Sequence, residues 1–166
     1  MQITPRMESW LAMRGIACST GEGFRRMVPW STLTFGLCTV VIALGTALAS
    51  TPILAVMVVI PALGALFQRH PFDAVYNYGI RRFTGTQTLP PNGPPTRFAC
   101  GLASVWMVAT IGAFEGGVAW LGYGLGAAIV IVGAIITFTH FCIPSLIYQT
   151  LFGDRSIAFR ALRLGR

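Results

Sequence analysis

His140 is the residue whose type and surroundings best suit ligand chemistry. It lies in a long apolar run, and Thr137 and Gly133, one and two helical turns earlier, leave space beside it. A neutral imidazole in such a place can ligate a haem iron or a (bacterio)chlorophyll magnesium. The alternative is a hydrogen bond from the ring to a neighbouring helix or a headgroup. Pro144 also leaves the His140 carbonyl without its helical donor, so local polar rearrangement is expected in either case. His70, beside Arg69 and Pro71, is interpreted as a residue of the membrane interface.

The other residue types that do chemistry are sparse and scattered. The five acidic residues include no close pair, and no Ser-His-Asp order, HExxH sequence or phosphate-binding glycine loop occurs. The four cysteines show no CxxC or other paired spacing, which indicates neither a disulfide framework nor a zinc site. We therefore expect no catalytic residues, no metal site and no enzymatic activity.

Composition indicates a membrane protein. Only 10% of the 166 residues are charged and 54% are hydrophobic, whereas about 25% of residues are charged in soluble domains. No charge occurs from Val28 to Gln68, and Glu115 is the sole charge from Phe98 to Gly153. All twelve basic residues are arginines that flank the apolar runs, so the net charge of +7 does not point to nucleic acid.

Four apolar runs predict an all-α integral membrane fold of four transmembrane helices in two hairpins. The first run, Pro29–Ala49, would span about 31 Å as a helix, close to the thickness of the hydrocarbon core. The second is Thr51–Phe67, which we expect Pro61 to interrupt near its far end, and the third is Phe98–Phe114. The fourth, from about Trp120 to Phe152, is too long for one straight span, so we expect a kink at Pro144 with the remainder lying toward the interface.

The arginines predict the orientation. Four precede the first run, four lie between the second and third, four follow the last, and the two short turns have none. The positive-inside rule then places both termini and the central loop in the cytoplasm, for a multi-pass protein of a bacterial inner membrane. The expected segments are a cytoplasmic N-terminal segment (1–28), a first hairpin (29–67), a cytoplasmic loop (68–97), a second hairpin (98–152) and an arginine-rich tail (153–166).

Three cytoplasmic segments have amphipathic patterns that suit the membrane interface or a partner: Ile3–Ala17, Pro71–Phe83 and the tail from Arg155. In the loop, LPPNGPPTRFACG (residues 89–101) predicts a stiff, mostly extended connector, because proline fixes φ and donates no backbone hydrogen bond. Aromatic residues and arginine dominate interface hot spots. The predicted partner or lipid interface is therefore Phe72, Tyr76, Arg81, Arg82, Phe83, Arg97 and Trp106. Trp106 lies near mid-membrane, where it would pack against a helix or a bound hydrophobic molecule.

Three stretches resemble a bacterial membrane family known as domain of unknown function 4395. They are Pro71-Phe72, the run Pro94-Pro95-Thr96-Arg97-Phe98-Ala99 and the pair Phe141-Cys142, and the resemblance covers roughly Val28 to Phe152. It implies a small four-span protein and assigns no chemistry. Members often carry a second cysteine after a glycine near the end of the last span. Here Ile143, Pro144 and Ser145 follow Cys142, which argues against a dithiol function.

The function expected from these features is that of a non-catalytic accessory subunit. It would dock in a larger membrane complex, with a photosynthetic or respiratory electron-transport assembly as the preferred kind. Partners would be other integral membrane subunits and anionic phospholipids. No cofactor is required by the sequence, although lipid, quinone, carotenoid or (bacterio)chlorophyll would suit the helix surface. The alternative is a small transporter or a thiol-redox membrane protein.

Overall fold

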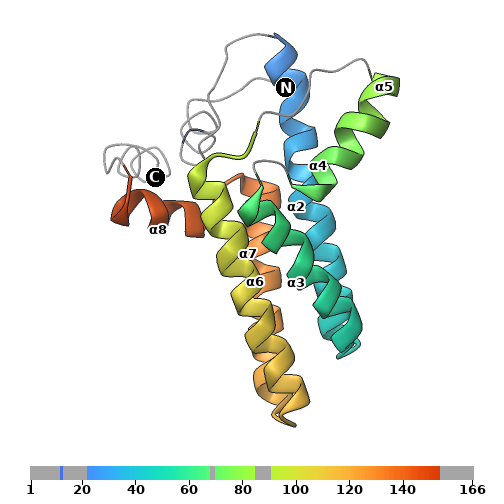
Figure 1. The fold of residues 1–166 in the computed structure, drawn as a ribbon, viewed down its shortest axis with the longest axis vertical. Coiled ribbons are helices and arrows are strands. Elements are labelled where there is room, and N and C mark those ends of the chain that lie inside the picture. The colour runs from blue at the N-terminus through green and yellow to red at the C-terminus, as the bar shows by residue number, and fades with distance from the viewer. Residues whose placement is uncertain (1–11, 13–21, 68–69, 85–90, 154–166) are drawn as a thin grey trace.

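The structure, a computed structural model, describes Ala12 and residues 22–67, 70–84 and 91–153. Side chains are described throughout these ranges except at residues 22–32, 74, 80, 81 and 84. The described residues form helices, turns and irregular segments without a strand (Figure 1). The elements are α2 (Glu22–Ala47), α3 (Thr51–Leu66), α4 (Pro71–Val75), the π-helical turn η1 (Tyr76–Ile80), α5 (Arg81–Thr84), α6 (Pro94–Glu115), α7 (Ala119–Thr139) and α8 (Ile143–Leu151).

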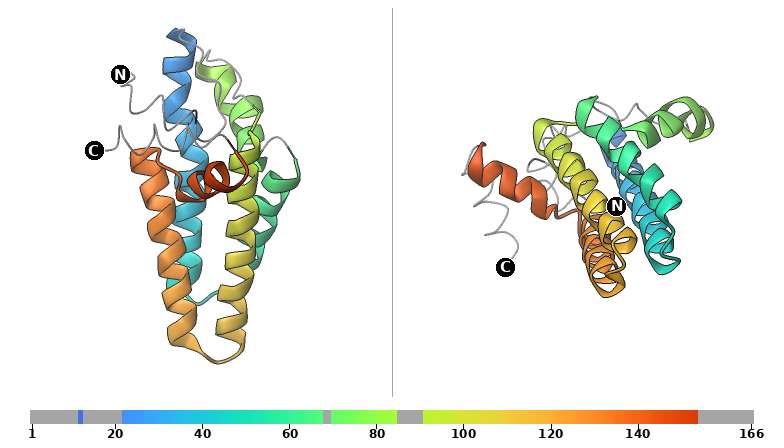
Figure 2. Two further views of the ribbon diagram at one scale, coloured as in Figure 1. Left: turned by 90° about the vertical axis from the view of Figure 1, so that its left-hand side faces the viewer. Right: turned by 60° about the horizontal axis from the view of Figure 1, so that its bottom comes forward.

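Two helical hairpins, α2–α3 and α6–α7, pack into one bundle. Helix α3 packs along α6 and α2 packs along α7, so each hairpin contacts the other through both of its helices (Figures 1 and 2). Both tight turns lie at one end, and the loops that carry α4, α5 and α8 lie at the other (Figure 1). The centre is filled by Ile42, Leu54, Met57 and Met107, each no more than 6% exposed.

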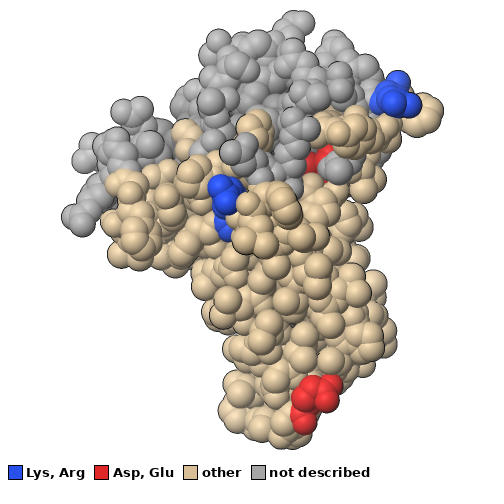
Figure 3. Space-filling view, in the orientation of Figure 1, with Lys and Arg blue, Asp and Glu red and all other residues tan. Residues whose placement is uncertain are grey.

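The helices confirm an all-helical fold with segments able to span a membrane. By length and composition, α6 and α7 can each cross a bilayer. Helix α3 and the segment Pro71–Gly79 meet at a bend of 82°. If the two are counted as one broken span, the chain has a third segment able to cross a bilayer. The apolar segment Leu33–Ala47 of α2 is shorter. On the face shown in Figure 3, the coloured charged side chains lie in the upper half and at the bottom tip, with none between them. Four complete crossings remain a prediction.

The third helix begins earlier than predicted. Pro94 and Pro95 occupy its first turn, with Gly93 as the N-cap, so the prediction that they belong to an extended connector is wrong. Proline is well tolerated there, because the first N–H groups of a helix have no intrahelical partner. Residues 91–93 are non-helical, as expected. The first helix also begins earlier than predicted, at Glu22 rather than Pro29.

The fourth run is divided at His140 and not at Pro144. His140 adopts a left-handed conformation with φ 63°, and its N–H donates to the Ile136 carbonyl, which ends α7. Pro144 instead lies in the first turn of α8, where it is compatible with the helix. Helix α8 then points sideways, away from the bundle, near its loop end (Figures 1 and 2). It is held on α6 by aromatic contacts of Phe98 with Tyr148 and Phe152.

The predicted amphipathic helix over Pro71–Phe83 is divided into α4, η1 and α5. Together these form an arm, residues 71–84, that extends from the loop end of the bundle (Figure 1). The other two predicted amphipathic segments, Ile3–Ala17 and the tail from Arg155, lie outside the described residues apart from Ala12.

Candidate functional site

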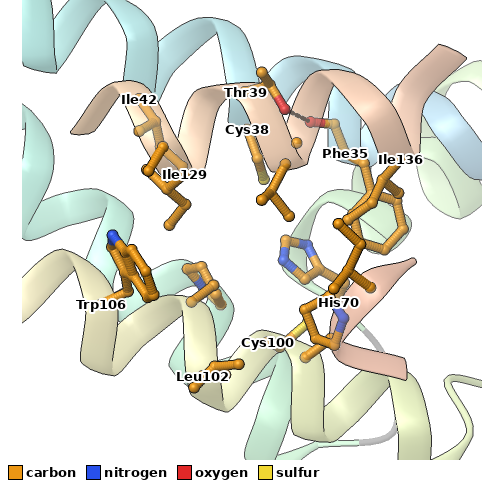
Figure 4. A pocket seen from close by; sticks show the side chains of 18 of the residues that line it. Phe35, Cys38, Thr39, Ile42, His70, Cys100, Leu102, Trp106, Ile129 and Ile136 are labelled. Carbon is orange, nitrogen blue, oxygen red and sulfur yellow. Dashed lines mark hydrogen bonds between the residues drawn. The ribbon is translucent and has the colours of Figure 1, made fainter. Parts of the chain in front are cut away.

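A cavity of about 340 Å³ lies inside the bundle near its loop end. Its wall is formed by α2, α6, α7 and the start of α8, together with Pro61 of α3 and His70 (Figure 4). Nearly all of this wall is aliphatic or aromatic carbon. A cavity of this size and character is typical of sites for small apolar ligands. The chemistry that it can offer depends on the few polar groups on its wall.

His70 is the most polar of these groups, and the start of α4 positions it. The Asp73 carboxylate accepts the His70 backbone N–H at 3.0 Å, and His70 Nδ1 accepts the Phe72 N–H at 3.4 Å. This is a reciprocal capping box with histidine in the usual place of serine or threonine. Pro71 follows at the first helical position. Gly64 of α3 leaves room for the ring, since a Cβ there would lie 2.6 Å from His70 Cδ2.

These hydrogen bonds determine the tautomer of His70. Because Nδ1 accepts a hydrogen bond from the Phe72 N–H, it carries no proton of its own, so the ring is neutral and its proton is on Nε2. Burial lowers the pKa of the His70 imidazole, and the Asp73 carboxylate opposes that shift. The side chain is only 4% exposed. The Nε2–H group has no acceptor among the described residues, and the ring is directed into the cavity (Figure 4).

The Asp73 carboxylate connects this site to the rest of the protein. Its Oδ1 accepts from the Thr34 hydroxyl of α2 at 3.0 Å, and its Oδ2 also accepts from the Asn92 side-chain amide at 3.3 Å. Asp73 is 8% exposed. One buried carboxylate therefore joins α2, the α4 cap and the segment that leads into α6.

Two thiols lie on the same wall. Cys38 comes from α2 and Cys100 from α6, and both are free (Figure 4). Within the part of the chain that the structure describes, no three or more His, Cys, Asp or Glu side chains are grouped as a metal ion requires. The thiols and His70 are thus among the few polar groups on an otherwise apolar wall.

The family described as Domain of unknown function (DUF4395) matches residues 30–152. The chain belongs to this family. No curated protein and no solved structure matches the chain. The match runs from the start of the apolar part of α2 to the end of α8, so the cavity lies entirely within the DUF4395 domain.

Trp106 of the DUF4395 domain lies where α6 and α7 meet. Its indole Nε1 donates to the Leu125 carbonyl at 3.0 Å, and its ring forms part of the cavity wall. The sequence predicted contact with a helix or a bound hydrophobic molecule. The helix contact is present.

His140 does not lie on the cavity wall. It ends α7, and the side chain is half-buried. Its proposed role as a pigment or haem ligand stays a prediction that no feature of the cavity supports.

The predicted interface residues have different environments. Arg97 binds within the chain: Nε donates to the Ala65 carbonyl at 2.8 Å and Nη2 to the Leu66 carbonyl at 3.0 Å, at the end of α3. Tyr76 is only 2% exposed, whereas Phe83 is 92% exposed and Arg82 is exposed. The Phe72 ring contacts the His70 ring, with centroids 5.6 Å apart. The Arg81 side chain lies outside the described part.

Sequence reasoning missed the cavity residues. Cys38 and Cys100 were interpreted only as cysteines without a paired spacing, and His70 as an interface residue. One signal was available: Asp73 follows His70 by three residues, with proline between them, which is a capping-box spacing. Nothing in the sequence indicated that α2 and α6 would bring two thiols to this histidine.

Proposed function

We propose that this DUF4395 protein is a non-catalytic accessory subunit that docks in a larger membrane complex and stabilises it. A photosynthetic or respiratory electron-transport assembly is the kind of complex that we propose. The observation that carries the proposal is the arm of residues 71–84, which presents large apolar side chains outside the bundle. Anionic phospholipids would contact the same end of the protein through the arginines.

The arm has an inner and an outer face. Asp73, Tyr76 and Asn77 are at most 8% exposed, so they belong to the inner face. Val75, Tyr78 and Phe83 are 61%, 70% and 92% exposed, respectively. Aromatic side chains with an adjacent arginine, here Arg82, are the residue types that contribute most to binding between proteins. An outer face of this kind supports docking to a partner subunit at the membrane surface.

Removal of the arm's aromatic contacts should release the protein from its complex. We expect Tyr78→Ser with Phe83→Ser to lower the fraction that migrates in a large assembly about tenfold or more, because two hot-spot residues typically contribute several kcal/mol. The measurement is native gel electrophoresis of gently solubilised host membranes that contain equal amounts of each variant. Phe138→Ser is the matched control, since Phe138 of α7 is 85% exposed at a different site. An unchanged assembly in the arm variant, or an equal loss in the control, would contradict docking through the arm.

We further propose that the loop end of the bundle faces the cytoplasm, in a bacterial inner membrane with four crossings. The supporting observation is that the Arg82 and Arg97 side chains belong to the loop end, whereas the turn Gly116–Val118 at the other end has no arginine. In a background without native cysteines, a cysteine at Gly117 should react with an impermeant maleimide added outside whole cells. A cysteine at Asn92 should react only after the cells are opened. The opposite result, or labelling of both from one side, would reject this topology.

A further inference from the structure

We propose that the cavity binds an uncharged, lipid-soluble carbonyl compound, with the chemistry of an isoprenoid quinone, whose carbonyl oxygen accepts a hydrogen bond from His70 Nε2. This inference concerns a ligand and is independent of the docking proposal. It follows from the wall of the cavity, from the one strong donor left on that wall and from the position of the cavity mouth.

The wall excludes charged ligands. No described arginine, aspartate or glutamate side chain lines the cavity, so an ionised headgroup would be buried without a partner, which is strongly unfavourable. A pure hydrocarbon is compatible with the wall. It would, however, cover the Nε2–H of the His70 ring without offering it an acceptor, and a donor that loses water without gaining a partner is also unfavourable.

The other strong donors on the wall are already engaged. The Thr39 hydroxyl donates to the Phe35 carbonyl at 2.8 Å, and Trp106 Nε1 donates to the Leu125 carbonyl. His70 Nε2–H is thus the group that selects the ligand. It requires one acceptor oxygen on an otherwise apolar molecule, and a ketone or quinone carbonyl is such an acceptor.

The cavity is placed to take this ligand from the bilayer. Leu102 and Trp106 of α6 and Ile147 of α8 line it, and these side chains are 37%, 39% and 41% exposed, respectively. We therefore place the mouth between α6 and α8, on the surface of a helix long and apolar enough to span a membrane. A long apolar tail could remain among lipid chains while the carbonyl-bearing group enters.

Trp106 reports directly on occupancy, because quinones quench indole fluorescence at short range. The test uses the full-length protein in mild detergent with Trp106 as the single tryptophan, the other three being replaced by phenylalanine. Decylubiquinone is the probe. We expect saturable quenching. Ala128→Phe, which fills the cavity, should weaken binding about tenfold or more, whereas the exposed neighbour Ala127→Phe should bind like the parent.

Two substitutions at His70 distinguish the role of Nδ1 in the capping box of α4 from the proposed role of Nε2 as a donor to the ligand. His70→Asn keeps an acceptor near the Nδ1 position but has no group at Nε2, whereas His70→Gln can place an amide N–H near Nε2 and weakens the cap. We expect His70→Asn to weaken decylubiquinone binding about three- to tenfold, the effect of one lost hydrogen bond, and His70→Gln to retain most of the affinity. If the His70→Asn and His70→Gln variants bind decylubiquinone equally well, or if His70→Asn binds it better, His70 Nε2 is not the donor to the ligand.

Two additional experiments test the cavity if the first variant is unsuitable and distinguish between possible ligands. If Ala128→Phe is not monodisperse, Ala103→Phe fills the cavity from α6, with the exposed Ala109→Phe as its control. Competition with a diacylglycerol distinguishes two sources of the same carbonyl chemistry: displacement at similar concentrations assigns the site to a lipid ester, and no displacement assigns it to a quinone. Quenching that does not saturate, or that is equal in filled and control variants, would overturn the proposal.

Discussion

Replacement of Asp73 by alanine is expected to destabilise the protein by about 3–5 kcal/mol, because each buried donor left without its acceptor costs about 1–3 kcal/mol. The carboxylate accepts hydrogen bonds from the Thr34 hydroxyl, the His70 backbone N–H and the Asn92 amide. Alanine would leave these three donors without their acceptor in a region that water hardly reaches. The measurement is the free energy of unfolding, obtained by titrating a denaturing detergent into micelles of a mild detergent that contain the protein.

Thr34→Val is the matched control for this prediction. It removes one of the three hydrogen bonds and keeps the carboxylate, so we expect a loss of about 1 kcal/mol. Asp73→Asn should fall between the two, because its remaining carbonyl oxygen can accept from only some of the donors. Equal stability of Asp73→Ala and Thr34→Val would show that the carboxylate does not hold α2, α4 and the segment before α6 together.

The long apolar helices were largely predictable. The run Thr51–Phe67 was expected to be helical with an interruption at Pro61. Helix α3 spans Thr51–Leu66, because Pro52 suits a helix start and the apolar residues continue to the end, but Pro61 lies inside it without interrupting it. The positions of both tight turns were also expected. Hydrophobicity and proline placement act over a few neighbouring residues, so these features are visible in the sequence alone.

The errors came from prolines whose effect depends on their position within a helix. Pro94 and Pro95 were interpreted as part of a connector and Pro144 as a kink, yet all three lie in the first turns of helices. The break before α8 is made by His140 in a left-handed conformation. Such a conformation is uncommon for residues other than glycine, so no local pattern announces it.

The cavity could not be predicted because its polar groups are distant in the sequence. Cys38, His70 and Cys100 are separated by about thirty residues each and meet only when α2 packs on α7 and α3 packs on α6. The choice of His140 over His70 rested on spacing within one helix. The capping box turns His70 inward, and that orientation depends on tertiary packing of Asp73 against Thr34.

Replacement of Arg97 by alanine is the second change with a large expected effect, a loss of about 2–3 kcal/mol. The last carbonyl groups of a helix have no intrahelical donors, and Arg97 supplies donors to those of Ala65 and Leu66 from the first turns of α6. Charge-assisted hydrogen bonds of this kind contribute about 1.5–3 kcal/mol each. The partial exposure of Arg97 reduces their sum.

Arg97→Lys and Arg82→Ala decide whether Arg97 acts within the chain or on a partner. Lysine keeps the charge but lacks the planar guanidinium that reaches two carbonyls at once, so Arg97→Lys should recover only part of the lost stability. Arg82 is exposed on the arm, and Arg82→Ala should leave the unfolding transition unchanged. Hydrogen exchange should accelerate at residues 63–67, at the end of α3, in Arg97→Ala and not in Arg82→Ala.

If the isolated Arg97→Ala protein is as stable as the parent but assembles less well, Arg97 acts on a lipid phosphate or a partner carboxylate. Loss of stability in the isolated protein establishes instead that this arginine joins the two hairpins, because it connects the end of α3 to the start of α6.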